Sequence, residues 1–242
     1  VWVKTGSIHE GKWMGAGISH LLEHMVFKGT ESFSGEELSK TVQAAGGQWN
    51  AYTSFDRTVY YIDGPADSAG TFLKAVTEMV FKPRFPEDEF EKEKDVIRRE
   101  IDMGLDDPDN RASRQLFSTA LANDGRSQPV IGHLELFNQI TYDDMVAYHK
   151  ARYTTENCFL SISGDFETDE ILVTLNALVG DIPRSFTQQA TPEVEPPQLG
   201  KRVERANFAI PASKLTLAWQ VPGLTHPDAA ALELLSTILG GG

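Results

Sequence analysis

The sequence has 242 residues, of which 40% are hydrophobic and 24% charged, values that are typical of a globular protein and exclude a disordered or fibrous chain. The formal net charge of −13 argues against general binding to nucleic acids or anionic membranes, and it fits basic or neutral polypeptide partners. No apolar run approaches the roughly 20 residues that a membrane-spanning helix needs.

Strands and helices alternate irregularly along the chain. Residues 1–8 alternate like a strand and lead into a helix over about 16–28, and a second helix over 34–45 opens with a capping box of Ser34 and Glu37. The pattern then predicts a hairpin over 48–65 with its turn at 54–57, helices near 72–80, 87–105, 110–123 and 141–152, a strand over 158–166 and a helix over about 168–179. This order predicts an α+β layered fold, with helices packed on a mixed, largely antiparallel sheet.

The single cysteine, Cys158, lies in the predicted strand near the end of this region. One cysteine excludes intramolecular disulfides and thiolate metal clusters. Its apolar surroundings indicate a small core residue.

The chain divides at a segment with three prolines and little periodicity, residues 184–200, which we interpret as a linker. It separates a domain over 1–183 from the start of a second domain over 201–242. The second part repeats the plan of the first, with a strand, a polar loop and a helix that contains a Leu-Leu pair. If residues 21–22 align with 234–235, then Glu233, Ser236 and Thr237 replace the histidines and glutamate of the first copy, so the chemistry would belong to the first.

Both ends of the chain are expected to be cuts within a larger protein. No signal peptide opens the sequence, and it stops on three glycines where a turn or loop should begin. The sequence therefore assigns no cellular compartment.

The first predicted helix carries two histidines and a glutamate on one face. At 100° per residue, His20, Glu23 and His24 lie within about a third of a turn of one another. The opposite face is apolar and consists of Ile18, Leu21, Leu22, Met25 and Val26. A catalytic zinc needs neutral imidazoles, an open position for water and a carboxylate that accepts the water's proton. The pattern therefore favours a metal site over an ordinary solvated face, where Lys, Arg and Glu would be commoner.

A catalytic zinc also needs a third protein ligand, and the other histidines are isolated in the sequence: His9, His133, His149 and His226. The long charged helix offers carboxylates instead. Glu93 and Glu100, seven residues apart, project together on the flank of its apolar stripe, and Glu89 lies on nearly the same flank. Carboxylates in such places are costly unless they are paired or bound to metal. Geometry alone leaves three candidates, and a solvated charged face remains the alternative.

The segment HLLEH, residues 20–24, is an instance of the inverted zinc motif H-x-x-E-H, and Glu100 follows His24 by 76 residues. With "EKEKDVIRRE" around Glu100, this spacing resembles the pitrilysin and insulysin family of zinc peptidases, which includes mitochondrial processing peptidase. Other segments are similar to that family over nearly the whole chain: "GAGISHLLEHMVFKGT", "GGQWNAYTSFDRTVYY", "DDPDN", "PVIGH" and "ITYDDMVAYHKARYTTENCFLSISGDF".

The resemblance implies a set of roles for these residues. One zinc ion would be bound by His20, His24 and Glu100, and Glu23 would be the general base. Glu93, seven residues before the third ligand, would support the catalytic site. The implied reaction is that of a zinc metalloendopeptidase, which hydrolyses peptide bonds in extended or unfolded polypeptides.

The resemblance also implies how substrate is held. Asn50 and Ala51 would contact the substrate backbone along a sheet edge. The implied fold is an α+β unit that occurs twice per protein, the two halves closing around an extended polypeptide. The family completes its site with an arginine and a tyrosine from the second half, which here stops at Gly242. The missing half or a partner subunit would supply them, so this fragment could hold zinc and still be a poor enzyme by itself.

Two rival functions remain at this point. The chain could be a non-catalytic subunit that binds peptides or assembles with an active partner, although such subunits lose the motif that is intact here. It could also carry a purely structural zinc, although structural sites usually have four protein ligands and no spare glutamate beside the metal.

Overall fold

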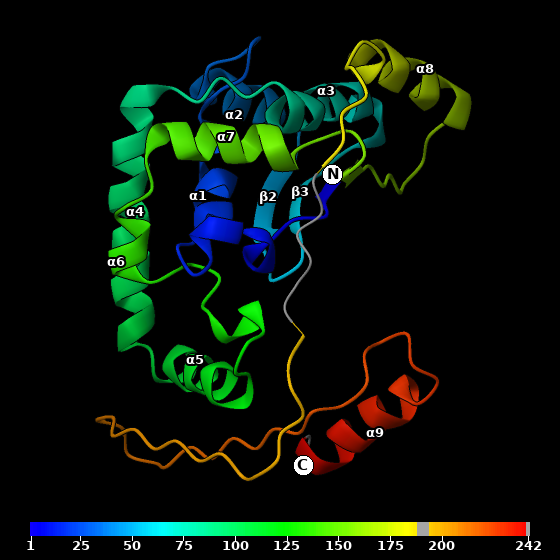
Figure 1. Cartoon of the computed structure of the whole chain (residues 1–242). Coiled ribbons are helices and arrows are strands. Elements are labelled where there is room, and N and C mark those ends of the chain that lie inside the picture. Colours follow the sequence, from blue (N-terminus) through cyan, green and yellow to red (C-terminus); the bar gives the residue numbers. More distant parts are fainter. Residues whose placement is uncertain (188–193, 241–242) are drawn as a thin grey trace.

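The computed structural model describes residues 1–187 and 194–240, and its centre is a four-stranded sheet. The strands are β1 (Trp2–Val3), β2 (Gln48–Thr53), β3 (Thr58–Asp63) and β4 (Cys158–Phe159), in the order β2-β3-β1-β4. All neighbours in this sheet are antiparallel. The predicted α+β fold with a largely antiparallel sheet is confirmed. Strand β2 forms one edge, and this edge approaches the helix that carries the histidines (Figure 1).

Helices cover the sheet and build the walls around the first helix. They are α1 (Ile18–Met25), α2 (Gly35–Ala44), α3 (Ala69–Phe81), α4 (Glu87–Asp106), α5 (Pro108–Ala120), α6 (Leu134–Phe137), α7 (Tyr142–Arg152), α8 (Thr168–Val179) and α9 (Ala229–Gly240). Helix α1 contacts β2, α4 and α7, while α3 contacts both β3 and α8. Figure 1 shows α4 running beside α1. Among the described residues, no helix combines the length and the apolar character needed to cross a membrane.

The predicted apolar faces of α1 and α4 lie in the core of the molecule. All five apolar residues predicted for the first helix are fully buried, and the stripe of α4 is buried at Phe90, Ile97 and Ile101. Burying one large apolar side chain stabilises the fold by about 1.5–3 kcal/mol. These contacts therefore fix the two helices against each other, and with them the polar residues on their flanks.

The first predicted strand is shorter than expected and ends after Val3. At Gly6 the backbone lies against the turn of the β2–β3 hairpin, where a Cβ atom would stand 2.3 Å from the carbonyl oxygen of Ser54. This close approach requires glycine and directs the chain out of the sheet. Residues 7–13 then form two 3₁₀ turns that lead to α1.

The predicted strand over 158–166 is also shorter, with pairing only at Cys158 and Phe159. The reason is its register: Val3 pairs with Cys158 and Trp2 with Phe159, so the partner strand ends as the chain proceeds. Residues 161–166 have no strand beside them among the described residues. Cys158 itself is half-buried and packs against the core, as predicted.

Of the elements predicted for residues 201–242, only the helix forms among the described residues, as α9. Leu234 and Leu235 of α9 are 62% and 48% exposed, whereas Leu21 and Leu22 are fully buried. The strand predicted ahead of this helix is absent from the described residues, because no other described strand lies beside it to pair with its backbone. Earlier in the same part of the chain, the Arg202 guanidinium donates to the carbonyl oxygen of Ala120, the last residue of α5, at 2.8 Å.

The proposed division of the chain stays a prediction. Residues 188–193 of the predicted linker over 184–200 lie outside the described residues, as do the last two glycines of the predicted second domain over 201–242. The domain over 1–183 contains all four strands of the sheet.

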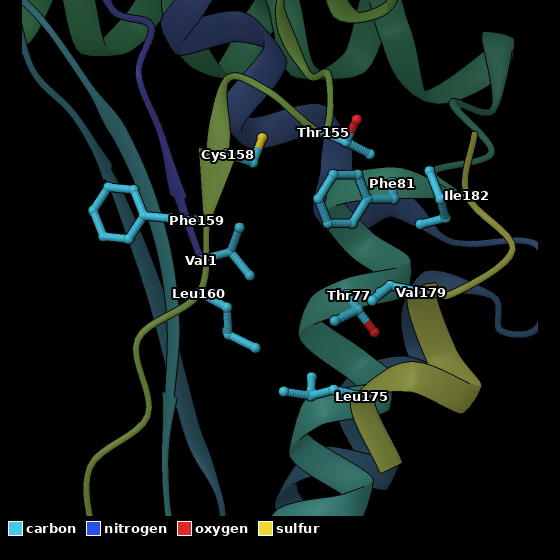
Figure 2. Close-up of a pocket in the computed structure, with 10 residues that line it drawn as sticks. All are labelled: Val1, Thr77, Phe81, Thr155, Cys158, Phe159, Leu160, Leu175, Val179 and Ile182. Carbon is cyan, nitrogen blue, oxygen red and sulfur yellow. The ribbon is translucent and has the colours of Figure 1, made fainter. Parts of the chain in front are cut away.

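An apolar cavity of about 240 Å³ lies between β4, α3 and α8 (Figure 2). Its walls include Val1, Phe81, Leu160, Leu175 and Val179. None of the residues that line it comes from α1 or α4, so it is separate from the histidine pair.

His149 gives the fold a testable response to pH. Its Nε2 atom lies 2.9 Å from the carbonyl oxygen of Val80, and burial lowers the pKa of His149 from 6.5 to about 4. Between these pH values the unfolded chain takes up a proton that the folded chain excludes, so the stability contributed here is present above pH 6.5 and is lost as pH falls.

We therefore expect the stability advantage of wild type over His149→Phe to shrink by about 2 kcal/mol between pH 7 and pH 4.5. Urea denaturation of both proteins across this range measures the difference. A difference that stays constant with pH would contradict the prediction.

Candidate metal centre

The start of α1 is held by a buried carboxylate. Gly17 adopts φ +78°, and a Cβ there would lie 2.2 Å from the carbonyl oxygen of Ile131, so the turn requires glycine. The Glu10 carboxylate accepts the N–H groups of Gly17 and Ser19 at 3.1 and 3.0 Å. Burial raises the pKa of Glu10 to about 8, although these two hydrogen bonds act in the opposite direction. Helix α1 is thus anchored at its first turn, one residue before His20.

The structure brings together three of the predicted site residues, His20, His24 and Glu100. One potential ligand atom from each lies within 4.8 Å of the other two. The Nε2 atoms of His20 and His24 are 3.9 and 3.8 Å from the same Glu100 oxygen. These distances are too long for hydrogen bonds. They are close to the distance between two ligand atoms of a tetrahedral zinc ion, which is about 3.4 Å. The donor set therefore fits a metal ion.

The pKa values of the two histidines shift in opposite directions. Burial, aided by the neighbouring His24, lowers the pKa of His20 to about 3, so His20 is neutral at physiological pH and can act as a ligand. Its Nδ1 atom is buried without a hydrogen-bond partner among the described residues. Burial also lowers the pKa of His24, but the hydrogen bond to Glu93 and the nearby carboxylates outweigh it and raise the pKa overall.

Glu93 fixes the orientation of His24. Its Oε2 atom lies 3.1 Å from Nδ1 of His24, and its other oxygen pairs with Lys28. Burial opposes the charge of Glu93, yet the hydrogen bonds to His24 and Lys28 lower its pKa overall. A carboxylate behind a histidine sets the ring's tautomer and leaves its other nitrogen free to face a metal. Glu93 therefore stands behind the donor set and is not part of it.

Glu23 lies on the same face of α1 and is buried. The hydroxyl of Thr53, at the end of β2, donates to Oε2 of Glu23. Burial raises the pKa of Glu23, while the Thr53 hydrogen bond counteracts that effect. The carboxylate of Glu100, by contrast, belongs to a side chain that is 39% exposed, so the group opens toward solvent.

Asn50 and Ala51 lie on the edge strand β2, shortly before Thr53. Exposure alternates along this strand, with Asn50 on the exposed face and Ala51 turned toward the helices. The Ala51 N–H donates to the Asn50 side-chain oxygen at 2.9 Å. Among the described residues, β2 pairs only with β3, so its other edge is open.

The remaining histidines and the third candidate carboxylate have other contacts. His149 bonds to a backbone carbonyl, His9 accepts the N–H of Gly6 at 3.2 Å, and His133 bonds to Gln128 at 2.9 Å. His226 accepts the N–H of Asp228, and Glu89 pairs with Lys92. Among the residues described, none of them joins the donor set.

Sequence reasoning missed three supporting residues. Lys28 follows His24 by four residues, so helical spacing already places the two on one face. Thr53 follows Ala51 by two residues, and strand alternation turns both to the same side. Glu10 gives no such signal, because the chain between it and α1 is irregular.

Comparison with known families matches both parts of the chain. Residues 1–133 match the profile of "Insulinase (Peptidase family M16)", and residues 139–242 match that of "Peptidase M16 inactive domain". The first match covers more than half of the chain and includes the complete donor set.

Individual relatives agree with this assignment. An uncharacterized zinc protease of Mycobacterium leprae is 28% identical over 100% of this chain and 55% of its own length. Subunit 1 of the human mitochondrial cytochrome b-c1 complex is 27% identical over 99% of this chain and 50% of its own. The crystal structure of a protease from Helicobacter pylori superposes with a TM-score of 0.78 at 27% identity, covering 83% of this chain and 49% of that one.

The chain spans about half the length of the relatives it matches. Fold, donor set and relatives point to the same assignment. The chain belongs to the insulinase family of peptidases, peptidase family M16.

Proposed function

We propose that this chain is the metal-bearing half of a zinc metalloendopeptidase, in which His20, His24 and Glu100 hold one zinc ion. The observation that carries the proposal is the convergence of these three donors from α1 and α4, with Glu23 beside them on α1. Two imidazoles and one carboxylate are a donor set that catalytic zinc sites use. When bound, zinc would supply Lewis acidity, which polarises a peptide carbonyl and makes water more acidic.

The protein's own residues handle the proton. Glu23 is the general base: its carboxylate accepts a proton from the attacking water and then returns it to the leaving amine. Its burial and raised pKa suit this exchange near neutral pH. Thr53 holds one carboxylate oxygen in place through its hydroxyl, so Glu23 is oriented from the strand as well as from its own helix.

The open edge of β2 is proposed to hold the substrate as an added strand. Backbone hydrogen bonds along such an edge straighten a peptide and leave selectivity to side-chain pockets, which favours extended or unfolded polypeptides. Asn50 and Ala51 lie on this edge close to Thr53, so a peptide bound there would pass the Glu23 carboxylate.

The rival functions fit the site less well. A non-catalytic subunit has support from the likeness to the cytochrome b-c1 subunit, but it would not need a carboxylate held beside the donor set. A structural zinc would normally have four protein ligands, and the described residues gather three. We also propose that a second half or partner subunit closes over the site and supplies an arginine and a tyrosine for substrate.

Glu23→Gln tests the mechanism. We expect the full-length protein carrying this change to lose hydrolysis of an unfolded polypeptide by about 10²–10⁴-fold, because the base is gone, while keeping one zinc per chain. Glu36→Gln, an exposed glutamate on α2, is the matched control and should leave both unchanged. Undiminished hydrolysis by Glu23→Gln, measured with zinc content by mass spectrometry, would rule out this mechanism.

Glu93→Gln tests the support of His24. Losing the charge behind the ring should weaken zinc binding by about tenfold, because the histidine becomes less basic and less fixed. Competition with a chromophoric chelator measures the affinity. Glu89→Gln changes a glutamate on the same helix that faces Lys92 and should have no effect. Equal affinities for wild type and Glu93→Gln would show that Glu93 has no role at the metal.

Asn50→Ala tests the substrate edge. We expect KM for a peptide to rise about fivefold, the effect of one neutral hydrogen bond, with kcat changed by less than about twofold. Gln48→Ala, two residues earlier on the same exposed face, serves as the comparison. Steady-state kinetics of wild type and both variants measure KM and kcat. Equal KM values for wild type and Asn50→Ala would show that Asn50 does not contact the substrate.

A further inference from the structure

A second cavity, of about 340 Å³, shares a wall with the candidate metal centre. It lies between the second half of α4, helix α5, the tip of the β2–β3 hairpin and residues 126–131. Glu100 is one of its lining residues, so a side chain bound in this cavity would be adjacent to the donor set. Figure 1 shows α5 turning back beneath the end of α4.

Gly104 allows α5 to come this close to α4. A Cβ atom at this buried position would lie 3.1 Å from Nδ2 of Asn110 and 3.3 Å from Nη2 of Arg114. Residues 100 and 104 are four apart and therefore share one face of α4. The Arg114 guanidinium thus lies beside Gly104, one helical turn after Glu100 on α4, and both Glu100 and Arg114 line the cavity.

Arg114 carries a charge that no carboxylate of the described residues neutralises. Its Nε donates to Oδ1 of Asn110 at 3.0 Å, and none of the described ion pairs includes Arg114. Arg126, the other cation of the cavity, differs because Asp124 accepts two of its hydrogen bonds, at 2.8 and 2.6 Å. The cavity therefore presents one guanidinium whose charge is available.

The remaining walls suit a side chain that is apolar in its stem. Phe55 and Phe117 form an aromatic wall, with ring centroids 5.1 Å apart. Glu100 is the single acidic residue among the described lining residues, and as a zinc ligand its carboxylate would be engaged by the ion. Half-burial of Arg114 removes part of its water shell, which strengthens a charge-assisted hydrogen bond formed there.

We propose that Arg114 makes this cavity a binding site for one acidic side chain of the substrate, beside the peptide bond to be cleaved. This inference rests on the proposed peptidase function. The guanidinium fork matches a carboxylate and discriminates against the neutral amide of the same shape. The overall charge of −13 acts on the approach of basic peptides, whereas Arg114 selects at contact distance, where the salt-screened field of distant charges is weak.

Matched peptides test the proposal in the zinc-loaded, full-length protein. The peptides differ only by glutamate or glutamine, placed in turn at each of the positions flanking the cleaved bond. At one position we expect kcat/KM to be about tenfold higher for glutamate, the effect of one charge-assisted hydrogen bond. Arg114→Gln should reduce this ratio to about one, and Arg114→Lys should restore part of it by restoring the charge.

Arg111→Gln is the matched control, because Arg111 is an exposed arginine on the same helix that stacks on Phe208, and it should keep the tenfold ratio. Thermal unfolding of each variant verifies that the helix remains folded. A ratio near one at every position in wild type would overturn the proposal, as would an unchanged ratio in Arg114→Gln.

A binding measurement distinguishes a failure of this proposal from a failure of the proposed peptidase function. Fluorescence anisotropy of the same labelled peptides is measured on Glu23→Gln protein, with and without Arg114→Gln. A glutamate preference that requires Arg114 supports the site even if the wild-type protein hydrolyses nothing, an outcome that would overturn only the peptidase function. Equal binding of both peptides, together with active hydrolysis by wild type, would overturn the acidic site and leave the peptidase function standing.

Discussion

Helices α1 and α4 pack against one another through fully buried side chains, and this contact brings residue 100 to residues 20 and 24. The two helices are remote in sequence, and a strand hairpin and two further helices separate them. Leu21 and Leu22 point into the core on one side of α1, while the two histidines flanking them point toward α4. The apolar face thus positions the polar one, and a change that loosens this packing would separate the three candidate metal donors.

Around this contact the polar groups support each other. Lys28 neutralises part of the charge of Glu93, and Glu93 orients His24. Thr53 restrains Glu23, and Glu10 anchors the first turn of α1. Buried polar groups are costly unless hydrogen-bonded, so a half-formed network would destabilise the fold. Glu23 and the three candidate metal donors are thus held in place by their surroundings, which is the preorganisation that the proposed catalysis would require.

Much of this could be predicted from the sequence, since local periodicity fixes which face of a helix is apolar. The longer helices of the first 180 residues and the hairpin at 48–63 were predictable for that reason, as were the histidine pair and its glutamate, whereas the single turn of α6 was missed because four residues are too few to show a period. Periodicity could not show which of Glu89, Glu93 and Glu100 is the third donor. It places all three on one flank of α4, but it does not show which other part of the chain packs against that flank. Their separate roles follow from tertiary contacts to Lys92, His24 and the donor set. The predicted ends of the strands were wrong for a related reason. Where a strand ends depends on its partner elsewhere in the chain, as at Phe159.

The central claim is that α1 and α4 hold one zinc ion between them. A crystal of the zinc-saturated full-length protein, with diffraction recorded on both sides of the zinc absorption edge, locates the ion directly. The account predicts a single anomalous peak about 2.0–2.2 Å from a nitrogen of His20, a nitrogen of His24 and an oxygen of Glu100. No peak at this position, or a peak bound by Glu93 in place of Glu100, would contradict it.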